Sequence, residues 1–592
     1  MSIELDLNVQ LLKKDVKLPS GALSESSSRK LFQWFLPDEG GVFRSADPSS
    51  IDSVVSLVLQ TTQSQIPAWQ MYLRDYLHVE GFAPQPASIS GAIIFVMVEV
   101  NGNAQFVAWC FGQGSRWLRK GTTTPRFGLI AALNAAAKST DSPDTGVLGA
   151  SVATQDGNLR RVSLLASNPG TTANLARIDT QADSLLSVHA NTKTEDLGRV
   201  VAGRSLQFSS LLNSVSDIQD LSEKVVGLSA GKDYRRANLW IDNRVPEEDP
   251  AVIDVVLERI WKVSDKTKSK DLVEISWWEP VRAADSDRPI THWRMAGERS
   301  GRNPVRRVTL TWAWVHSVIT HSSPNILARA AFEREIRFFS TDDEEVGRCR
   351  LIDILSAQVS IGRVTYALVD GDVYRVDKTF LASLNSGLES CVCKSRLISY
   401  EPGESEPEYN KRAARESGML LLDTSDIRPT GETEIEPCDL LSTDGSLFHV
   451  KRHSTATGIS HLSNQAVSSA TLLLREVSSR AKLKDLIQKS PWAVKDKNKV
   501  QRLVDQIQTK NWRPKVVFVI VGEWENPSIQ KLSLLSRLAL RTAISRLSDL
   551  GFPVEIMLIE PNKKVSPKNM PRARWDEDSR KRVEYGDDHS KR

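Results

Sequence analysis

Apolar and polar residues alternate through the first 235 residues in a pattern that predicts strands interleaved with helices. Residues 3–13 alternate with period two, which is typical of a half-buried strand. Residues 90–112, "SGAIIFVMVEVNGNAQFVAWCFG", form two apolar runs around an Asn-Gly-Asn turn and predict a hairpin. Residues 126–138, "RFGLIAALNAAAK", have helical spacing. We therefore expect an N-terminal α+β domain over residues 1–235.

Residues 236–400 are rich in strand-like segments and contain a cluster of tryptophans. Alternation in "VTLTWAWVH", residues 308–316, predicts an antiparallel strand with Trp312 and Trp314 on one face. Three arginines precede this segment: Arg302, Arg306 and Arg307. Aromatic residues interleaved with arginines can stack on bases, but a core or interface face with a charged rim is the favoured interpretation. We expect a strand-rich middle domain.

The last third of the chain begins after a Pro/Glu/Ser-rich break at residues 399–408. Its apolar periodicity predicts the element order helix, strand, strand, strand, helix, strand, helix, strand. Such an order is typical of an α/β domain with a mixed sheet, here over residues 401–560. Residues 561–592 are charged and are expected to be a disordered tail. The fold class expected is therefore multidomain α/β, with α+β N-terminal and middle domains.

Length and composition agree with several soluble domains. The chain has 592 residues, 40% apolar and 25% charged, and no apolar run approaches the ~20 residues that span a bilayer. The opening residues do not form a secretory signal pattern. Five sparse cysteines, including Cys391 and Cys393, are read as reduced thiols and not as a zinc site. We expect a cytoplasmic protein without membrane insertion.

Positive charge is concentrated in the last fifth of the chain. The net charge is only +4, but residues 475–515 contain 12 Lys/Arg against 4 Asp/Glu. This density predicts phosphate contacts with nucleic acid, although a run of like charges is often only a solvated face. The expected nucleic-acid-binding residues are Lys482, Lys484, Lys495, Lys497, Lys499 and Arg452.

A polar trio interrupts the apolar hairpin predicted at residues 435–454. If a three-residue loop ends at Gly445 in the left-handed conformation, Leu441 faces Leu447 and Asp439 lies opposite His449. Lys451, two residues further along, then joins the same face. A carboxylate, an imidazole and a lysine together can bind a divalent cation, activate water and neutralise developing charge.

This spacing, "PCD" then "HVK" with nine residues between, resembles the PD-(D/E)xK nuclease superfamily, and the predicted element order is similar to its restriction-endonuclease-like core. The resemblance implies catalytic roles for Asp439, His449 and Lys451, with Mg²⁺ or Mn²⁺ bound by Asp439 and His449. It also implies contributions from Glu408 on the preceding helix and Gln465 on the following one. The pattern departs from the superfamily in two ways, because His449 replaces an acid and Cys438 is inserted before Asp439. An ordinary polar sheet face remains an alternative.

Several further stretches resemble a sporadically distributed bacterial family whose genes lie near mobile elements and phage-defence genes. They include "IPAWQMYL" (66–73), "FGQGSRWL" (111–118), "GDVYRVD" (371–377), "EYNKRAA" (408–414) and "SHLSNQA" (460–466). The resemblance implies a defence context and carries no activity with it. Three hypotheses stay open: a metal-dependent endonuclease acting on foreign DNA, a nuclease-like DNA-recognition subunit that does not cut, and a protein-interaction scaffold. The expected partners are DNA and a second copy of the chain or another defence protein.

Overall fold

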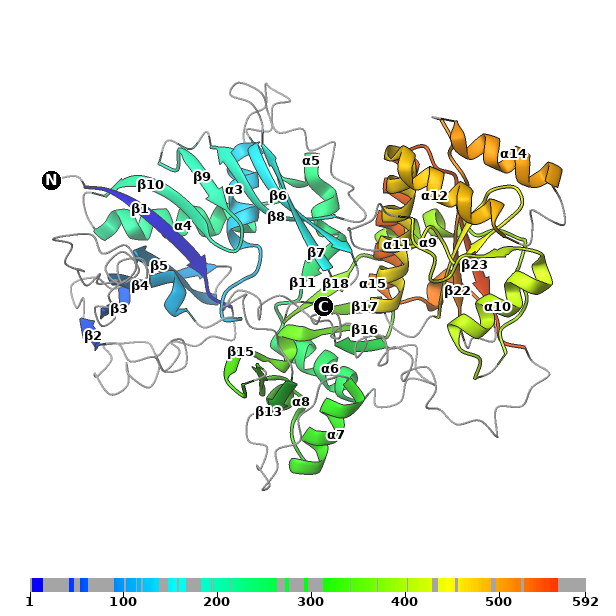
Figure 1. The fold of residues 1–592 in the computed structure, drawn as a ribbon. Helices are drawn as coiled ribbons and strands as arrows, with labels where there is room; N and C mark the ends of the chain where they lie inside the picture. Colours follow the sequence, from blue (N-terminus) through cyan, green and yellow to red (C-terminus); the bar gives the residue numbers. More distant parts are fainter. Residues whose placement is uncertain are drawn as a thin grey trace, which may run out of the picture. The chain divides into compact units, whose positions relative to one another are not determined.

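The computed structural model describes the parts of the chain that follow: residues 3–13, 42–46, 54–61, 90–100, 103–112, 114–118, 121–137, 147–156, 159–166, 183–192, 194, 196–212, 215–262, 272–275, 292–295, 312–340, 342–369, 371–401, 403–427, 435–452, 456–490, 497–509, 511–522 and 526–562. They are mixed α/β, with several sheets (Figure 1). Within these ranges, no helix combines the length and apolar character that crossing a bilayer requires.

The chain divides into two compact units. The first unit contains residues 1–153, 162–258 and 371–375, and the second contains residues 154–161, 259–370 and 376–592.

A large sheet dominates the first unit, with strand order β2-β3-β4-β5-β1-β10-β9-β8-β6-β7. Its strands are β1 (Ile3–Leu11), β2 (Val42–Ala46), β3 (Val54–Thr61), β4 (Ser90–Val100), β5 (Asn103–Gly112), β6 (Val147–Asp156), β7 (Leu159–Ala166), β8 (Asp183–Asn191), β9 (Arg199–Ala202) and β10 (Leu206–Leu212). The predicted first strand and the hairpin of residues 90–112 are confirmed, since β4 pairs antiparallel with β5 up to Val100 opposite Asn103.

Two helices pack on this sheet and on each other: α3 (Phe127–Ala137), which confirms the predicted helix, and α4 (Val215–Ala230). Trp109 is fully buried between them and the sheet, and its indole N–H donates to Ser222 at 2.8 Å. The smaller elements are η1 (Gly114–Trp117), α5 (Arg235–Asn238), η3 (Leu239–Asn243), β11 (Arg244–Pro246), and most of α6 (Pro250–Trp261) and β18 (Asp372–Val376). The end of α6 from Arg259, and Val376 of β18, belong to the second unit. The buried carboxylate of Asp372 pairs with Lys13 and Arg204, which fixes residues 371–375 in this unit.

The second unit begins with two small antiparallel sheets. One contains β12 (Leu272–Ile275), β16 (Leu355–Ile361) and β17 (Val364–Val369). The other contains β13 (His292–Met295), β14 (Glu335–Phe339) and β15 (Glu345–Arg350). Three short helical elements accompany them: α7 (Trp312–Ser322), α8 (Ala328–Phe332) and η5 (Leu351–Ile354).

The strand predicted over residues 308–316 is wrong, because α7 begins at Trp312. Trp312 and His316 are one helical turn apart, and both pack on Trp261, at ring-centroid distances of 5.7 and 4.5 Å. Trp312 is buried, which agrees with a core role and not with base stacking. The side chain of Trp314 and the three arginines at 302, 306 and 307 lie outside the described residues.

The C-terminal elements are α9 (Lys378–Glu389), α10 (Glu406–Ser417), β19 (Leu420–Leu421), β20 (Leu440–Leu441), β21 (Leu447–Arg452), α11 (Ala456–Arg475), α12 (Val477–Gln488), α14 (Lys497–Gln508), β22 (Val516–Val521), η6 (Ile529–Lys531), α15 (Leu534–Asp549) and β23 (Val554–Ile559). The predicted order of helices and strands is confirmed, with α12 and α14 as additions. The sheet β19-β20-β21-β22-β23 is mixed, since β20 and β21 are antiparallel while β21, β22 and β23 are parallel.

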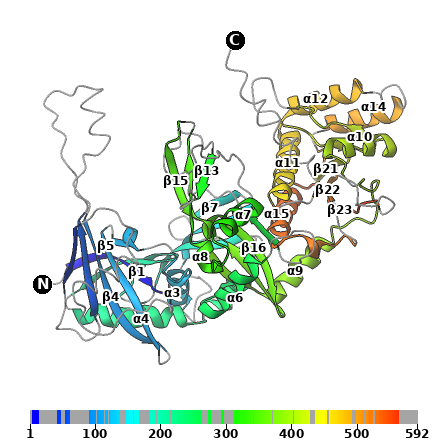
Figure 2. The same cartoon turned by 90° about the horizontal axis from the view of Figure 1, so that it is seen from below.

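Helices cover both faces of this sheet (Figures 1 and 2). On one face α9, α11 and α15 pack against Val516, Phe518 and Ile520 of β22. On the other face α10 packs against Phe448 and Val450 of β21 and the alternate residues of β22. Full burial of β22 on both faces explains its uninterrupted apolar sequence, "VVFVIV". The end of the β20–β21 hairpin is covered by α12 and α14.

Candidate functional site

The hairpin of β20 and β21 has the predicted register. Leu441 pairs with Leu447, and the amide of Ser442 donates to the carbonyl of Ser446 at 3.1 Å. The loop therefore has three residues, and it ends at Gly445 with φ of +87°. A left-handed residue at this position is what the three-residue hairpin loop requires.

Asp439 lies immediately before the paired part of β20. Its Oδ2 accepts the backbone N–H of Val450 at 2.7 Å, in place of a partner strand's carbonyl. The side chain is therefore turned along the edge of β21, and only 4% of it is exposed. The backbone N–H of Asp439 still donates to the carbonyl of Phe448 at 3.0 Å, so the side chain replaces the backbone of β20 only as the acceptor for Val450.

Two further acids meet Asp439 at this edge. Asp423, Glu436 and Asp439 each offer a carboxylate oxygen, and the three oxygens lie within 4.8 Å of one another. We call these three residues the acidic cluster. Glu436 is fixed at both oxygens, by the backbone N–H of Thr424 at 3.1 Å and by Nε2 of Gln465 at 2.8 Å. Such a set of oxygen donors can hold a metal ion.

Backbone strain accompanies the acidic cluster. Thr424, directly after Asp423, has φ of +69° although it is β-branched. This conformation is unfavourable for a β-branched residue and persists only where the surroundings enforce it. Here the Thr424 amide is held by Glu436.

The charge of Asp439 is poorly compensated. Burial raises the pKa of Asp439 well above its ordinary value, the Val450 N–H opposes this shift, and the negative charges of Glu406, Asp423 and Glu436 raise the pKa further. A buried carboxylate among like charges must gain a proton or a cation. Its electrostatic surroundings therefore favour a bound positive charge.

Two residues of α10 reach this region. Glu406 Oε1 accepts from Nζ of Lys451 at 2.9 Å, and both side chains remain partly exposed. Nδ2 of Asn410 lies 3.4 Å from Oδ1 of Asp439. Lys451 is thus held by Glu406, a residue whose charge also acts on Asp439.

The structure does not bring His449 into the acidic cluster. His449 is completely buried, and its Nε2 lies 3.5 Å from Oγ of Ser469 on α11. Burial lowers its pKa to about 3, so the imidazole is neutral at physiological pH. The face predicted to be shared with Asp439 is lost because Asp439 leaves the pleat to bind the Val450 amide.

The two helix residues have different environments. Glu408 is exposed and forms a capping box with Ser405, accepting the Ser405 N–H at 2.8 Å. It therefore stabilises the start of α10 and is not part of the acidic cluster. Gln465 does reach the cluster, through its hydrogen bond to Glu436.

The predicted nucleic-acid-binding residues are partly accessible. Lys482 pairs with Asp426 at 3.4 Å, and Asp426 also accepts the N–H of Ile435, next to Glu436. Lys484 is half-buried, Lys497 and Lys499 at the start of α14 are exposed, and the guanidinium of Arg452 lies over the ring of Tyr400. Lys495 lies outside the described residues. Lys482 therefore borders the loop that supports the acidic cluster.

Sequence reasoning missed four residues of this region: Glu406, Asn410, Asp423 and Glu436. A signal for two of them was present. Asp423 directly follows the apolar run "MLLL", and Glu436 precedes Asp439 by three residues. Acids at the ends of adjacent predicted strands are candidates for meeting at one sheet edge.

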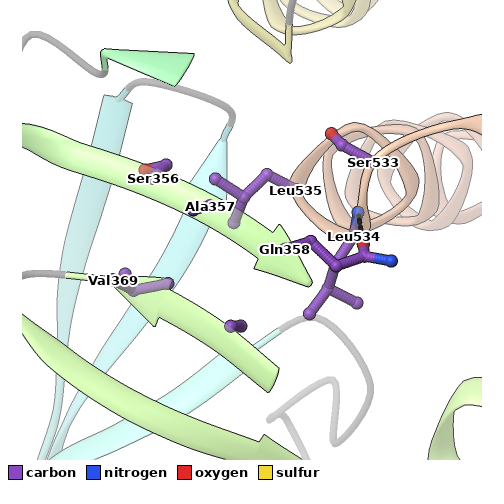
Figure 3. Close-up of a pocket in the computed structure, with 8 residues that line it drawn as sticks. Ser356, Ala357, Gln358, Val369, Ser533, Leu534 and Leu535 are labelled. Carbon is purple, nitrogen blue, oxygen red and sulfur yellow. Dashed lines mark hydrogen bonds between the residues drawn. The ribbon is translucent and has the colours of Figure 1, made fainter. Parts of the chain in front are cut away.

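A small cavity elsewhere in the second unit is not a candidate functional site. It lies between β16, β17 and the first turn of α15 (Figure 3), and its lining is mostly apolar. Oε1 of Gln358 accepts the N–H of Leu534 there at 2.7 Å, which caps α15. None of the lining residues is ionisable, so the cavity joins β16 and β17 to α15 without offering chemistry.

Comparison with known proteins gives one match. The model of a family described as "Family of unknown function (DUF6119)" matches residues 7–560. Neither the comparison with curated proteins nor the comparison with solved structures produced a match.

Proposed function

Because the chain belongs to the DUF6119 family of unknown function, we propose its function from its own geometry: it binds foreign DNA and hydrolyses phosphodiester bonds with a divalent cation held by the acidic cluster. The observation that carries the proposal is the buried carboxylate of Asp439 among the acids Asp423 and Glu436. Lys451 is paired with Glu406, whose charge also acts on Asp439.

The donor set fits Mg²⁺ or Mn²⁺. All three cluster residues offer carboxylate oxygen, which these hard ions prefer, and a doubly charged ion offsets most of their negative charge. Exclusion of His449 removes a softer nitrogen ligand. The donor set thereby agrees better with an oxygen-preferring cation than the sequence pattern does.

Each residue has a role in the proposed hydrolysis. The water oxygen bonds to phosphorus and the water releases one proton to solvent, the phosphorus–oxygen bond to the leaving nucleoside breaks, and the leaving oxygen takes up one proton from solvent. A divalent cation, when bound, would supply activated water and charge stabilisation. Asp423, Glu436 and Asp439 would hold the cation, and Gln465 orients Glu436.

Lys451 carries the positive charge available to the developing phosphorane-like transition state. Its ion pair with Glu406 keeps the ammonium group at the first turn of α10. From α10 to β22 the order is helix, three strands, helix and strand, with the added helices α12 and α14 before the last strand, and it supports a restriction-endonuclease-like core for this chemistry.

Basic residues next to the site support DNA as the substrate. Lys482 lies beside the loop that carries the cluster, and Lys497 and Lys499 are exposed at the start of α14. Their phosphate contacts would hold the backbone of DNA without reading its sequence. The resemblance to a family near phage-defence genes favours foreign DNA.

Purified full-length protein incubated with supercoiled plasmid, linear duplex and single-stranded DNA tests the proposal. Wild type is expected to cut in Mg²⁺ or Mn²⁺ and to be inactive in EDTA. Asp439→Asn and Lys451→Ala should lower the rate by about 100-fold or more, as loss of a transition-state electrostatic partner does. The matched control is Glu408→Gln, which keeps the capping box and should cut normally.

The opposite outcome identifies the non-cutting alternative. If wild type binds DNA but cuts none of the three substrates with either ion, hydrolysis is excluded. The basic helices then make DNA recognition the function of this part of the chain.

A further inference from the structure

Asn410 is a buried polar residue without a structural explanation. It lies on the inner face of α10, beside Tyr409 and Ala413, and is 0% exposed. Its Nδ2 makes one long contact, 3.4 Å to Oδ1 of Asp439, and its Oδ1 has no hydrogen-bond partner within the described ranges. The neighbouring Tyr409 is different, because its hydroxyl donates to the carbonyl of Ile398 at 3.0 Å.

Burial of an amide with an unsatisfied oxygen lowers the free energy of unfolding. Asparagine offers two donor hydrogens and an acceptor oxygen, and buried polar atoms are normally satisfied. The other buried residues of α10 pack an apolar face, where leucine or alanine would serve the helix better. The residue is aimed at the acidic cluster, since its amide nitrogen points to Asp439.

We propose that Asn410 is the fourth ligand of the cation site, coordinating through Oδ1. The inference rests on the proposed function, because it needs a cation at the acidic cluster. Without a cation, the carboxylate of Asp439 attracts the Nδ2–H group of Asn410, so the amide nitrogen faces the cluster. Rotation of the amide by half a turn exchanges Nδ2 and Oδ1 and presents the oxygen to the cation that the carboxylates hold.

A neutral fourth ligand suits the charge of this site. Three carboxylates already exceed the charge of a divalent ion, so a fourth acid would add repulsion inside the protein. An amide oxygen adds coordination without adding charge. It is also an oxygen ligand of the type that hard divalent ions accept.

The test measures Mn²⁺ binding calorimetrically, and thermal melting with and without Mn²⁺, on the full-length protein. Asn410→Leu should weaken Mn²⁺ binding by about tenfold or more. Its melting temperature without metal should equal or exceed that of wild type, because the unsatisfied amide is gone. Ser469→Ala, a buried polar residue next to His449, is the control and should leave Mn²⁺ affinity unchanged.

The outcomes separate this inference from the proposed function. If wild type binds no Mn²⁺, or Asp439→Asn binds it as wild type does, the cation site itself is excluded. If Asp439→Asn loses binding while Asn410→Leu keeps wild-type affinity, the fourth ligand is excluded and the proposed function stands. Should Asn410→Leu not fold, Asn410→Asp decides, because its affinity must differ from that of wild type if position 410 coordinates the ion.

Discussion

At the scale of single residues, His449 links stability to pH. Its folded-state pKa of about 3 lies below the ordinary value of 6.5, so folding favours the neutral imidazole. Stability is complete above pH 6.5 and is lost as pH falls towards 3. Between pH 6.5 and 4.5, urea unfolding should show wild type losing about 2 kcal/mol relative to His449→Gln.

The exposed His321 provides the control for this measurement. His321→Gln should follow the wild-type dependence on pH. Equal pH dependence of wild type and His449→Gln would contradict the burial of the imidazole.

Asp439 has the opposite pH dependence. Its folded-state pKa lies above the unfolded value, so folding favours the protonated acid, and stability is lost as pH rises from about 4 through the folded-state pKa. At pH 7.5 without metal, Asp439→Asn should therefore unfold at a higher denaturant concentration than wild type. Its free energy of unfolding should be higher by on the order of 1 kcal/mol. Added Mn²⁺ should stabilise wild type and leave the variant unchanged. If Asp439→Asn is less stable than the wild type without metal, the buried charge of Asp439 does not destabilise the metal-free protein.

The sequence predicted part of this site for a physical reason. The turn chemistry of residues 443–445 determines the hairpin register, so the position of Asp439 next to β21 could be derived. The direction of its side chain could not, because it depends on the hydrogen bond that the carboxylate accepts from the Val450 amide. Asp423 and Glu436 come together through a loop whose strained Thr424 has no sequence signature.

At the scale of elements, the hairpin loop depends on Gly445. Its φ is +87°, and a Cβ there would lie 2.9 Å from Cδ1 of Leu503 on α14. Gly445→Ala should lower the free energy of unfolding by about 1–2 kcal/mol. Gly387→Ala in α9, where a Cβ meets nothing within 4 Å, is the control and should raise it by about 0.5–1 kcal/mol. Equal effects of the two substitutions would exclude a left-handed requirement at Gly445.

The helices α12 and α14 should determine the salt dependence of DNA binding. Replacing Lys484, Lys497 and Lys499 by glutamine should weaken binding and reduce the log–log slope by roughly one unit for each lysine that binds a phosphate in the wild type. The matched control changes the same charge elsewhere in the second unit, at the exposed lysines Lys378, Lys394 and Lys531. If both triple variants bind with the same affinity and slope, α12 and α14 are only a solvated face.

The elements themselves show where sequence patterns succeed. The buried run "VVFVIV" and the two apolar runs of β4 and β5 around their Asn-Gly-Asn turn predict strands correctly, because each run is short and mostly buried. The segment starting at Trp312 is misleading because its residues alternate and also fit a helical turn. Packing of Trp312 and His316 on the distant Trp261 agrees with the helix, and this contact is not visible in the local sequence.

At the scale of the whole molecule, the predicted mixed α/β class and the presence of more than one compact unit are confirmed. Residues 371–375 belong to the first unit, where Asp372 pairs with Lys13 and Arg204. This assignment could not be derived from the order of segments along the chain. The predicted boundaries at residues 235, 400 and 560 and the tail of residues 561–592 stay predictions.

The central claim is that a divalent cation binds at the acidic cluster. An anomalous-scattering map from crystals of the full-length protein grown with Mn²⁺ tests it most directly. The account predicts a peak at roughly 2.0–2.6 Å from carboxylate oxygens of Asp423, Glu436 and Asp439. Crystals with fully ordered side chains at these three acids and no anomalous peak between them would contradict the account.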